Sequence, residues 1–127
     1  MTHKQVEKYI LSLPGVKLDY PFGEDVAVYK FIPTESVGSK RIKPDAPDGG
    51  RGKMFALIQE KKEPVQLSLK CDPQLAETLR QKYESVLPGY HLNKKHWNTI
   101  LLTGQLSWEE VQDLVKHSYD LVADLEK

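Results

Sequence analysis

The chain has 127 residues, of which 39% are hydrophobic and 28% charged, a composition typical of one folded globular domain rather than a disordered segment. Its 18 basic and 18 acidic residues sum to a formal net charge of zero, whereas a nucleic-acid-binding domain is usually basic overall. A lone cysteine, Cys71, excludes an internal disulfide, and the lack of a long apolar run or a signal-peptide core leads us to expect a cytoplasmic protein with no membrane segment.

The first predicted helix covers about residues 3–13. Thr2 and Gln5 form a capping-box pattern, and four apolar side chains recur at helical spacing: Val6, Tyr9, Ile10 and Leu13. A Pro-Gly pair ends this pattern. The next turn, Tyr20–Gly23, holds two aromatic residues. We expect these aromatics to plug one end of the core, with a trans bond before the proline.

Three strands are predicted next, over about residues 26–32, 53–59 and 64–71. The first two are rich in β-branched and aromatic residues, and the third alternates apolar with polar side chains, as in a sheet with one buried and one wet face. Residues 33–52 are rich in Pro, Gly, Ser and Asp, so we expect a flexible loop there. The three strands together suggest an antiparallel meander.

A second helix is expected to begin at Asp72-Pro73, because Asp caps free N–H groups and Pro suits the first helical position. A further strand is predicted over about residues 97–102, and the Ser107/Glu110 capping box opens a long amphipathic helix. The predicted order is α-β-β-β-α-β(β)-α. This order indicates an α+β fold, a two-layer sandwich of helices packed on a mainly antiparallel sheet, in one domain over residues 1–127 and as a monomer.

Charge is segregated along the chain. Residues 104–127 carry six acidic residues against two lysines, a net charge of −4, so residues 1–103 sum to +4. A basic face can therefore exist on a neutral molecule.

The stretch Pro88–Ile100 gathers two His, two Lys, two Asn, a Tyr and a Trp between segments with ordinary helix and strand patterns. Connections usually carry small turn formers and scattered charge, so this density of donors, cations and aromatic faces indicates a binding surface.

Six segments, in order along nearly the whole chain, resemble the MmcQ/YjbR proteins: Leu13–Val16, Tyr20–Gly23, Lys53–Ala56, Leu69–Pro73, Pro88–Thr99 and His117–Tyr119. The resemblance implies a small α+β domain related to the frataxin-like and secretion-chaperone-like folds. It also implies a "double-wing" shape, compared with a phage DNA-binding domain, and hence DNA binding by analogy of shape. The chain departs from the family pattern at residues 33–52, where the family has a shorter link.

We therefore predict weak, phosphate-directed DNA binding, in which lysines neutralise phosphates, asparagines donate to phosphate or sugar, and aromatic rings stack on bases. The predicted contacts lie in the Pro88–Ile100 stretch, which we call the binding stretch, and in the loop over residues 33–52. They are Tyr90, His91, Asn93, Lys94, Lys95, His96, Trp97, Asn98, Lys40, Arg41, Lys43 and Arg51.

Two other interpretations of the stretch stay open. Trp97 at a strand start is equally suited to the core, with the lysines forming a solvated corner. The stretch would also suit a protein-interaction or small-ligand module, since His91, Asn93, His96 and Trp97 can line a pocket for an acidic ligand. If Lys94 and Lys95 project outward beside the Lys40–Lys53 loop, a phosphate track is favoured; if they fold inward around a cavity, a ligand site is favoured.

Metal and catalytic chemistry are not predicted. His91 and His96 are five residues apart, which does not place both on one helix face, and no carboxylate lies between them. Cys71 falls on the apolar face of its strand, as a buried structural cysteine would, and His117 is expected to hydrogen-bond into the core or to a motif backbone. No phosphate loop or nucleophile elbow is present, so we expect no enzyme and no cofactor.

Overall fold

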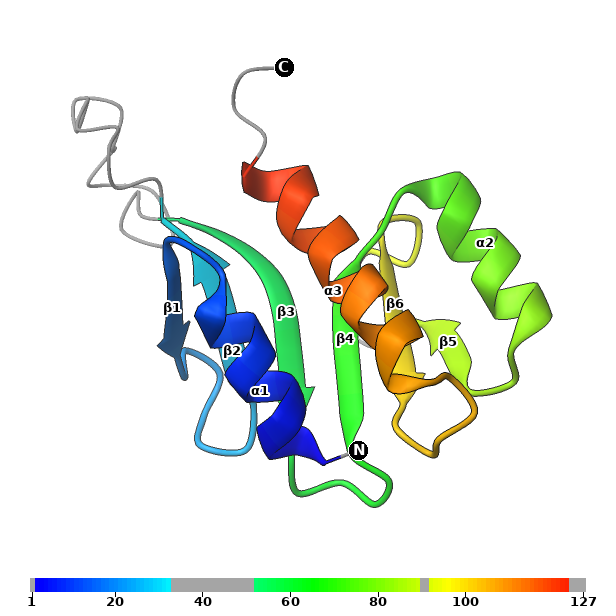
Figure 1. The fold of residues 1–127 in the computed structure, drawn as a ribbon, viewed down its shortest axis with the longest axis horizontal. Helices are drawn as coiled ribbons and strands as arrows, with labels where there is room; N and C mark the ends of the chain where they lie inside the picture. The colour runs from blue at the N-terminus through cyan, green and yellow to red at the C-terminus, as the bar shows by residue number, and fades with distance from the viewer. Residues whose placement is uncertain (1, 33–51, 90–91, 124–127) are drawn as a thin grey trace.

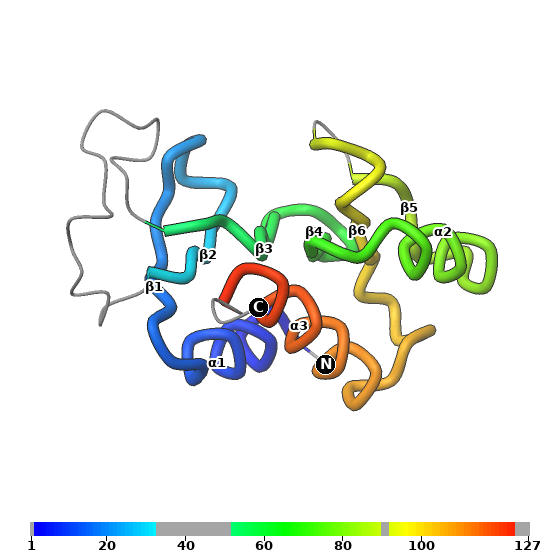
Figure 2. The backbone as a smooth tube through the Cα atoms, turned by 90° about the horizontal axis from the view of Figure 1, so that it is seen from above, coloured from blue at the N-terminus to red at the C-terminus, as the bar shows by residue number. Residues whose placement is uncertain are grey.

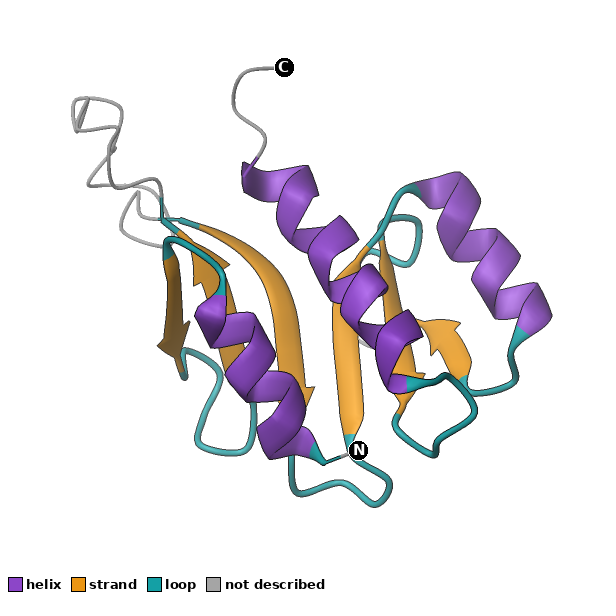
Figure 3. Ribbon diagram, in the orientation of Figure 1, coloured by secondary structure: helices purple, strands orange, loops and turns teal. Residues whose placement is uncertain are grey.

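A computed structural model describes residues 2–32, 52–89 and 92–123 of the chain, and every structural statement below concerns these residues. The predicted contacts Tyr90, His91, Lys40, Arg41, Lys43 and Arg51, and the expected flexible loop, lie outside the described residues. Three helices and six strands follow one another in the order α1, β1, β2, β3, β4, α2, β5, β6, α3 (Figures 1 and 3).

The helices begin where the sequence predicts. Helix α1 runs over His3–Ser12, α2 over Pro73–Lys82 and α3 over Trp108–Ala123. The Ser107/Glu110 capping box forms, with two reciprocal hydrogen bonds of 2.8 and 3.1 Å, whereas at α1 the Thr2 hydroxyl caps the helix by accepting from the Gln5 N–H at 3.2 Å. The Asp72 carboxylate accepts from the N–H groups of Gln74 and Leu75, so it caps α2 as predicted.

The strands form one antiparallel sheet of order β1-β2-β3-β4-β6-β5. Their bounds are Val16–Asp19 (β1), Ala27–Phe31 (β2), Lys53–Gln59 (β3), Gln66–Lys70 (β4), Val86–Pro88 (β5) and Trp97–Leu101 (β6). The predicted meander is confirmed as β2-β3-β4. The edge strand β1 was not predicted, because it has only four residues and three of them are exposed.

One face of the sheet is covered by helices, which confirms the α+β two-layer class. Edge-on, α1 and α3 lie on one side of the strands (Figure 2). Helix α2 contacts β5 and β6 on this side, where the Asn98 amide donates to the Ala76 carbonyl at 3.2 Å. Between the layers lies the main core, whose largest fully buried side chains are Tyr29, Phe55, Ile10, Ile58, Leu67, Leu69 and Ile100.

A bulge in β3 decides which side chains reach this core. Tyr29 pairs with Ala56, but the next residue of β2, Lys30, pairs with Met54, so Phe55 is an extra residue on β3. Phe55 and Ala56 are consecutive and both belong to the main core, while Met54 packs on the other face. The buried Ser118 hydroxyl fixes the bulge to α3, because it donates to the Phe55 carbonyl at 2.6 Å and accepts from the Lys70 N–H at 2.9 Å.

The other face carries no helix, and we call it the open face. A small second cluster of buried residues, Val28, Leu57 and Trp97, lies on it, flanked by Val26, Met54 and Leu92. Beside this cluster, the hydroxyls of Ser68 and Thr99 form a hydrogen bond of 2.9 Å between β4 and β6. The connections over 20–26 and 92–96 both project on the open-face side, away from α1 and α3 (Figure 2).

The aromatic turn Tyr20–Gly23 corrects an expectation. Neither ring plugs the core: Tyr20 is 43% exposed and Phe22 is 63% exposed. Helix α1 and strand β1 already close that end of the main core, since the Tyr119 hydroxyl donates to the Pro14 carbonyl at 2.6 Å and Val16 packs against the core. The bond before Pro21 is trans as expected; within the described segments the cis bond is Glu63–Pro64.

Candidate nucleic-acid interface

The turn Asn93–His96 is the exposed tip of the predicted binding stretch. All four of its residues are exposed, whereas the four residues that follow are buried. The local sequence explains the turn: the Asn93 side-chain oxygen accepts from the Lys95 N–H at 2.9 Å, and its carbonyl accepts from the His96 N–H at 3.1 Å. This use of Asn93 leaves its amide NH₂ group for a ligand.

Three contacts hold the turn against the sheet and α2. The Cys71 N–H donates to the His96 carbonyl at 2.7 Å, and the Arg80 guanidinium donates to the Lys94 carbonyl at 3.1 Å. At the base, the Gly89 N–H donates to the Trp97 carbonyl at 2.9 Å. A Cβ on Gly89 would lie 2.7 Å from the Trp97 Cβ, so this close approach requires glycine.

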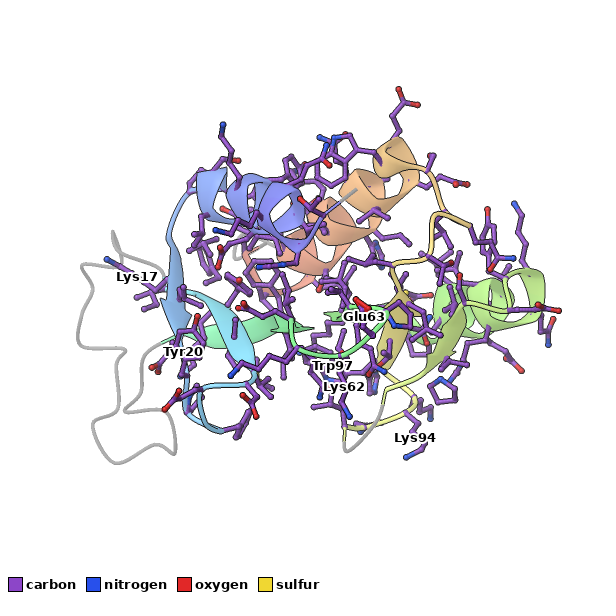
Figure 4. The ribbon with its side chains drawn as sticks, turned by 90° about the horizontal axis from the view of Figure 1, so that it is seen from below. Lys17, Tyr20, Lys62, Glu63, Lys94 and Trp97 are labelled. Carbon is purple, nitrogen blue, oxygen red and sulfur yellow. The ribbon has the colours of Figure 1, made fainter. Side chains whose placement is uncertain are left out.

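Lys94 and Lys95 are exposed rather than folded inward around a cavity, and the loop residues 40–51 beside which they were expected lie outside the described residues. Figure 4 shows the Lys94 side chain at the outer limit of the molecule, on the side opposite to α1 and α3. Neither lysine takes part in any ion pair found among the described residues. Within the described part of the chain, no carboxylate therefore neutralises these two charges through an ion pair.

Trp97 and Asn98, both predicted as ligand contacts, have structural positions instead. The Trp97 ring is 6% exposed and packs with Val28 and Leu57, so its faces are not available for stacking on a base. Asn98 is 2% exposed and its NH₂ group donates to the Ala76 carbonyl of α2. We correct both assignments: the strand β6 begins at Trp97, and alternation buries one of these side chains in each face of the sheet.

Two cations that sequence reasoning left out lie beside the turn. Lys70 is the residue of β4 that pairs with Trp97, and Arg80 of α2 holds the Lys94 carbonyl. The sequence could have indicated Lys70, because it is one of the polar residues of an alternating strand and these residues lie on the wet face of the sheet. Arg80 had no such signal, since only the packing of α2 brings it to the turn.

The opposite end of the open face is acidic and aromatic. Asp19, Glu24 and Asp25 flank the exposed Tyr20 and Phe22. Asp25 forms an ion pair of 3.0 Å with Lys61, and Asp19 lies 3.7 Å from the Lys30 ammonium. Burial, followed by the charges of Glu60 and Glu7, raises the pKa of the Tyr20 hydroxyl. Among the described residues, these carboxylates make this end less favourable to a polyanion than the Asn93–His96 end.

Other candidate chemistry has structural explanations. Burial raises the pKa of the Cys71 thiol to about 11, so the thiol stays protonated at neutral pH. His117 meets a motif backbone as expected: its Nε2 accepts from the Asp72 N–H at 3.2 Å. Within residues 2–32, 52–89 and 92–123, no three His, Cys, Asp or Glu side chains gather closely enough to hold a metal ion.

The same part of the chain contains no helix long and apolar enough to cross a membrane.

The sequence profile of the YjbR family matches residues 11–121. The chain belongs to the YjbR family. Among relatives, the chain is 34% identical over 122 residues to the uncharacterised protein YbdF of Escherichia coli O157:H7. The matched region covers 96% of the chain and 84% of YbdF. The chain is 42% identical over 72 residues to the uncharacterised protein YjbR of Escherichia coli K12, which covers 57% of the chain and 61% of that protein. The predicted MmcQ/YjbR membership is confirmed.

Solved structures confirm the fold of this YjbR protein. The crystal structure of Deinococcus radiodurans protein DR2400 matches with a TM-score of 0.81 at 32% identity, covering 99% of this chain and 81% of that one. The crystal structure of a Pseudomonas syringae protein matches with a TM-score of 0.70 at 27% identity, covering 96% and 99% of the two chains.

Proposed function

We propose that this YjbR protein is a weak, phosphate-directed DNA-binding protein that uses the Asn93–His96 turn. The observation that carries the proposal is the exposure of Lys94, Lys95 and His96 on the open face, with both lysines outside the ion pairs found in the described part of the chain. Lys70 and Arg80 add positive charge next to the turn.

The chemistry of the turn suits phosphate better than base edges. Lysine ammonium groups neutralise phosphate as point charges, and the free NH₂ group of Asn93 can donate to a phosphate or sugar oxygen. With Trp97 buried, the turn offers no described aromatic face for a base. Sequence-independent contacts of this kind supply affinities on the order of 10⁻⁴–10⁻⁶ M and depend strongly on salt.

The predicted contributions of Tyr90, His91, Lys40, Arg41, Lys43 and Arg51 remain part of the proposal. The implied double-wing likeness supports it by shape alone. The proposal includes the cytoplasmic location that the sequence leads us to expect.

The test is a titration with a labelled duplex and a labelled single strand at about 50 mM and about 200 mM salt. Lys94→Ala/Lys95→Ala is compared with Lys4→Ala/Lys8→Ala, which removes the same charge from two exposed residues of α1 on the helix-covered side. We expect salt-sensitive binding that the first variant weakens about tenfold and the second changes by less than about twofold.

Equal losses in the two variants would mean that net charge, not the turn, drives the binding. An absence of binding to either probe at low salt would reject the proposal and transfer the assignment to a protein or small-ligand partner at the same surface.

A further inference from the structure

The two edges of the sheet are protected to different degrees. The edge strand β5 has three residues and ends at Pro88, which has no N–H to donate to a neighbouring strand. The opposite edge strand, β1, has four residues and no proline, and among the described residues no strand pairs with its outer side. Figure 1 shows β1 at the outer limit of the sheet.

The register of β1 on β2 shows which backbone groups face outward. The Gly15 carbonyl accepts from the Ile32 N–H at 2.8 Å, so Gly15 is in a hydrogen-bonded pair with β2. In an antiparallel ladder such pairs alternate along the strand. The backbone N–H and C=O groups of Lys17 and Asp19 therefore also face β2. The N–H and C=O groups of Val16 and Leu18 consequently point to the outer side, where no strand among the described residues pairs with them.

Exposed apolar side chains concentrate at the same edge. Of the six large hydrophobic side chains that are exposed among the described residues, four lie between residues 11 and 22: Leu11, Leu18, Tyr20 and Phe22. Leu11 belongs to α1, the helix that contacts β1. Exposed apolar side chains on both sides of an edge strand, next to outward-facing backbone donors and acceptors, are characteristic of a strand that pairs with another chain.

We propose that β1 pairs with β1 of a second copy of this chain, antiparallel, about a two-fold axis at Leu18. In this register Leu18 lies opposite Leu18, and each Lys17 lies opposite Asp19 of the other copy. Two opposite-charge cross-strand pairs therefore form from one strand sequence. Two-fold axes at Lys17 or at Asp19 would instead place like charges directly opposite each other.

Pairing with a second copy requires the Tyr20 N–H and the Asp19 carboxylate to exchange their present hydrogen bond for bonds to the other chain, and both groups can do so. In the isolated chain the Asp19 carboxylate accepts from the Tyr20 N–H at 2.8 Å, and its side chain is 59% exposed. Pairing would transfer the Tyr20 N–H to the Val16 carbonyl of the second copy, and would leave the carboxylate for Lys17. The Lys17 side chain extends outward from this end of the sheet (Figure 4). An interface of one short strand is small, so association is expected only at high protein concentration.

Sedimentation across a wide concentration range tests the charge pairing. We expect the wild-type mass to rise toward that of a dimer, and Lys17→Glu or Asp19→Lys to weaken association on the order of tenfold, because each reversal creates two like-charge pairs. The double variant Lys17→Glu/Asp19→Lys exchanges the two charges and should restore the wild-type association. Failure of this rescue, or a monomer at every concentration, would overturn the proposal.

A crosslinking experiment tests the register independently. Leu18→Cys should form an intermolecular disulfide, since directly opposite hydrogen-bonded residues have Cα atoms about 5.5 Å apart. The native Cys71 is 4% exposed and does not compete. Leu87→Cys, at a 42% exposed position on β5, is the matched control at the protected edge. Equal crosslinking rates for the two variants would also overturn the proposal, whether or not the protein binds DNA.

Discussion

The two faces of the sheet bury apolar residues to very different extents. The helix-covered face holds sixteen buried side chains in one cluster, while the open face holds three. Hydrogen bonds from Ser118, Tyr119 and Asn98 tie the helix-covered layer to backbone carbonyls. On the open face the exposed cations of the Asn93–His96 turn lie beside the small cluster. The difference indicates that stability comes mainly from one face, which leaves the other free to carry exposed charged side chains.

The largest expected loss of stability comes from truncating a core side chain on β3, and its neighbour on the open face provides the comparison. Ile58 is fully buried in the main core and Leu57 is 7% exposed in the small cluster. We expect Ile58→Ala to lower the free energy of unfolding by about 4 kcal/mol and Leu57→Ala by about 2 kcal/mol, because the smaller cluster can relax around a cavity. Urea denaturation of both variants measures this. Equal losses would show that both faces contribute similarly to stability.

Ser118 provides the next largest effect, through hydrogen bonds rather than packing. Ser118→Ala leaves the Phe55 carbonyl and the Lys70 N–H without their partner in a buried site, which should cost about 2 kcal/mol. The control is Ser12→Ala, because the exposed Ser12 hydroxyl bonds only the Tyr9 carbonyl one turn back and its loss should cost less than about 0.5 kcal/mol. Thermal unfolding of the two variants makes the comparison. Similar melting temperatures would contradict the bridging role of Ser118.

The Trp97→Phe variant tests whether a buried residue of the open face contributes to stability without contributing to DNA affinity. Trp97→Phe reduces the contacts with Val28 and Leu57 and should cost about 1–2 kcal/mol. DNA affinity at low salt should stay within about twofold of wild type, because the ring is buried and phosphate contacts dominate. Denaturation and titration on the same samples give both numbers. A large loss of affinity with unchanged stability would restore Trp97 to the binding site.

The smallest expected effect on stability comes from the charge of the Glu110 carboxylate in the first turn of α3. Hydrogen bonding from the Ser107 N–H, and then from the Tyr83 hydroxyl at 2.7 Å, lowers the pKa of the Glu110 carboxyl below its ordinary value of 4.5. A lowered folded-state pKa adds stability above the unfolded-state pKa, and this stability is lost as the pH falls through the folded-state pKa.

Glu110→Gln should therefore lower the urea midpoint slightly at pH 7, and the difference from wild type should shrink as the pH falls below 4.5. Denaturation midpoints over this pH range provide the measurement. A difference that is constant with pH would show that the carboxylate charge is not the source of the effect.

Local patterns predicted much of the fold. Capping residues marked the starts of α1, α2 and α3, and apolar alternation placed β4 correctly. The exposed lysines of the candidate site were also predictable, since a Lys-Lys pair next to Asn in a turn has no apolar pattern to bury it. The positions of Trp97, Tyr20 and Phe22 were not. An aromatic residue suits a core and a surface equally well by composition, and only the neighbouring elements decide which it meets.

The sequence by itself determined the element types, the family and the charged tip of the binding stretch, because each depends on residues close together in the chain. Tertiary structure alone decided the rest. The bulge at Phe55 reverses which residues of β3 reach the core, and a shift of one residue in register moves side chains to the other face. Packing of α2 brings Arg80 to Lys94, and the sheet order leaves β1 at an edge. Each of these follows from contacts between distant segments, whose free energies no local pattern records.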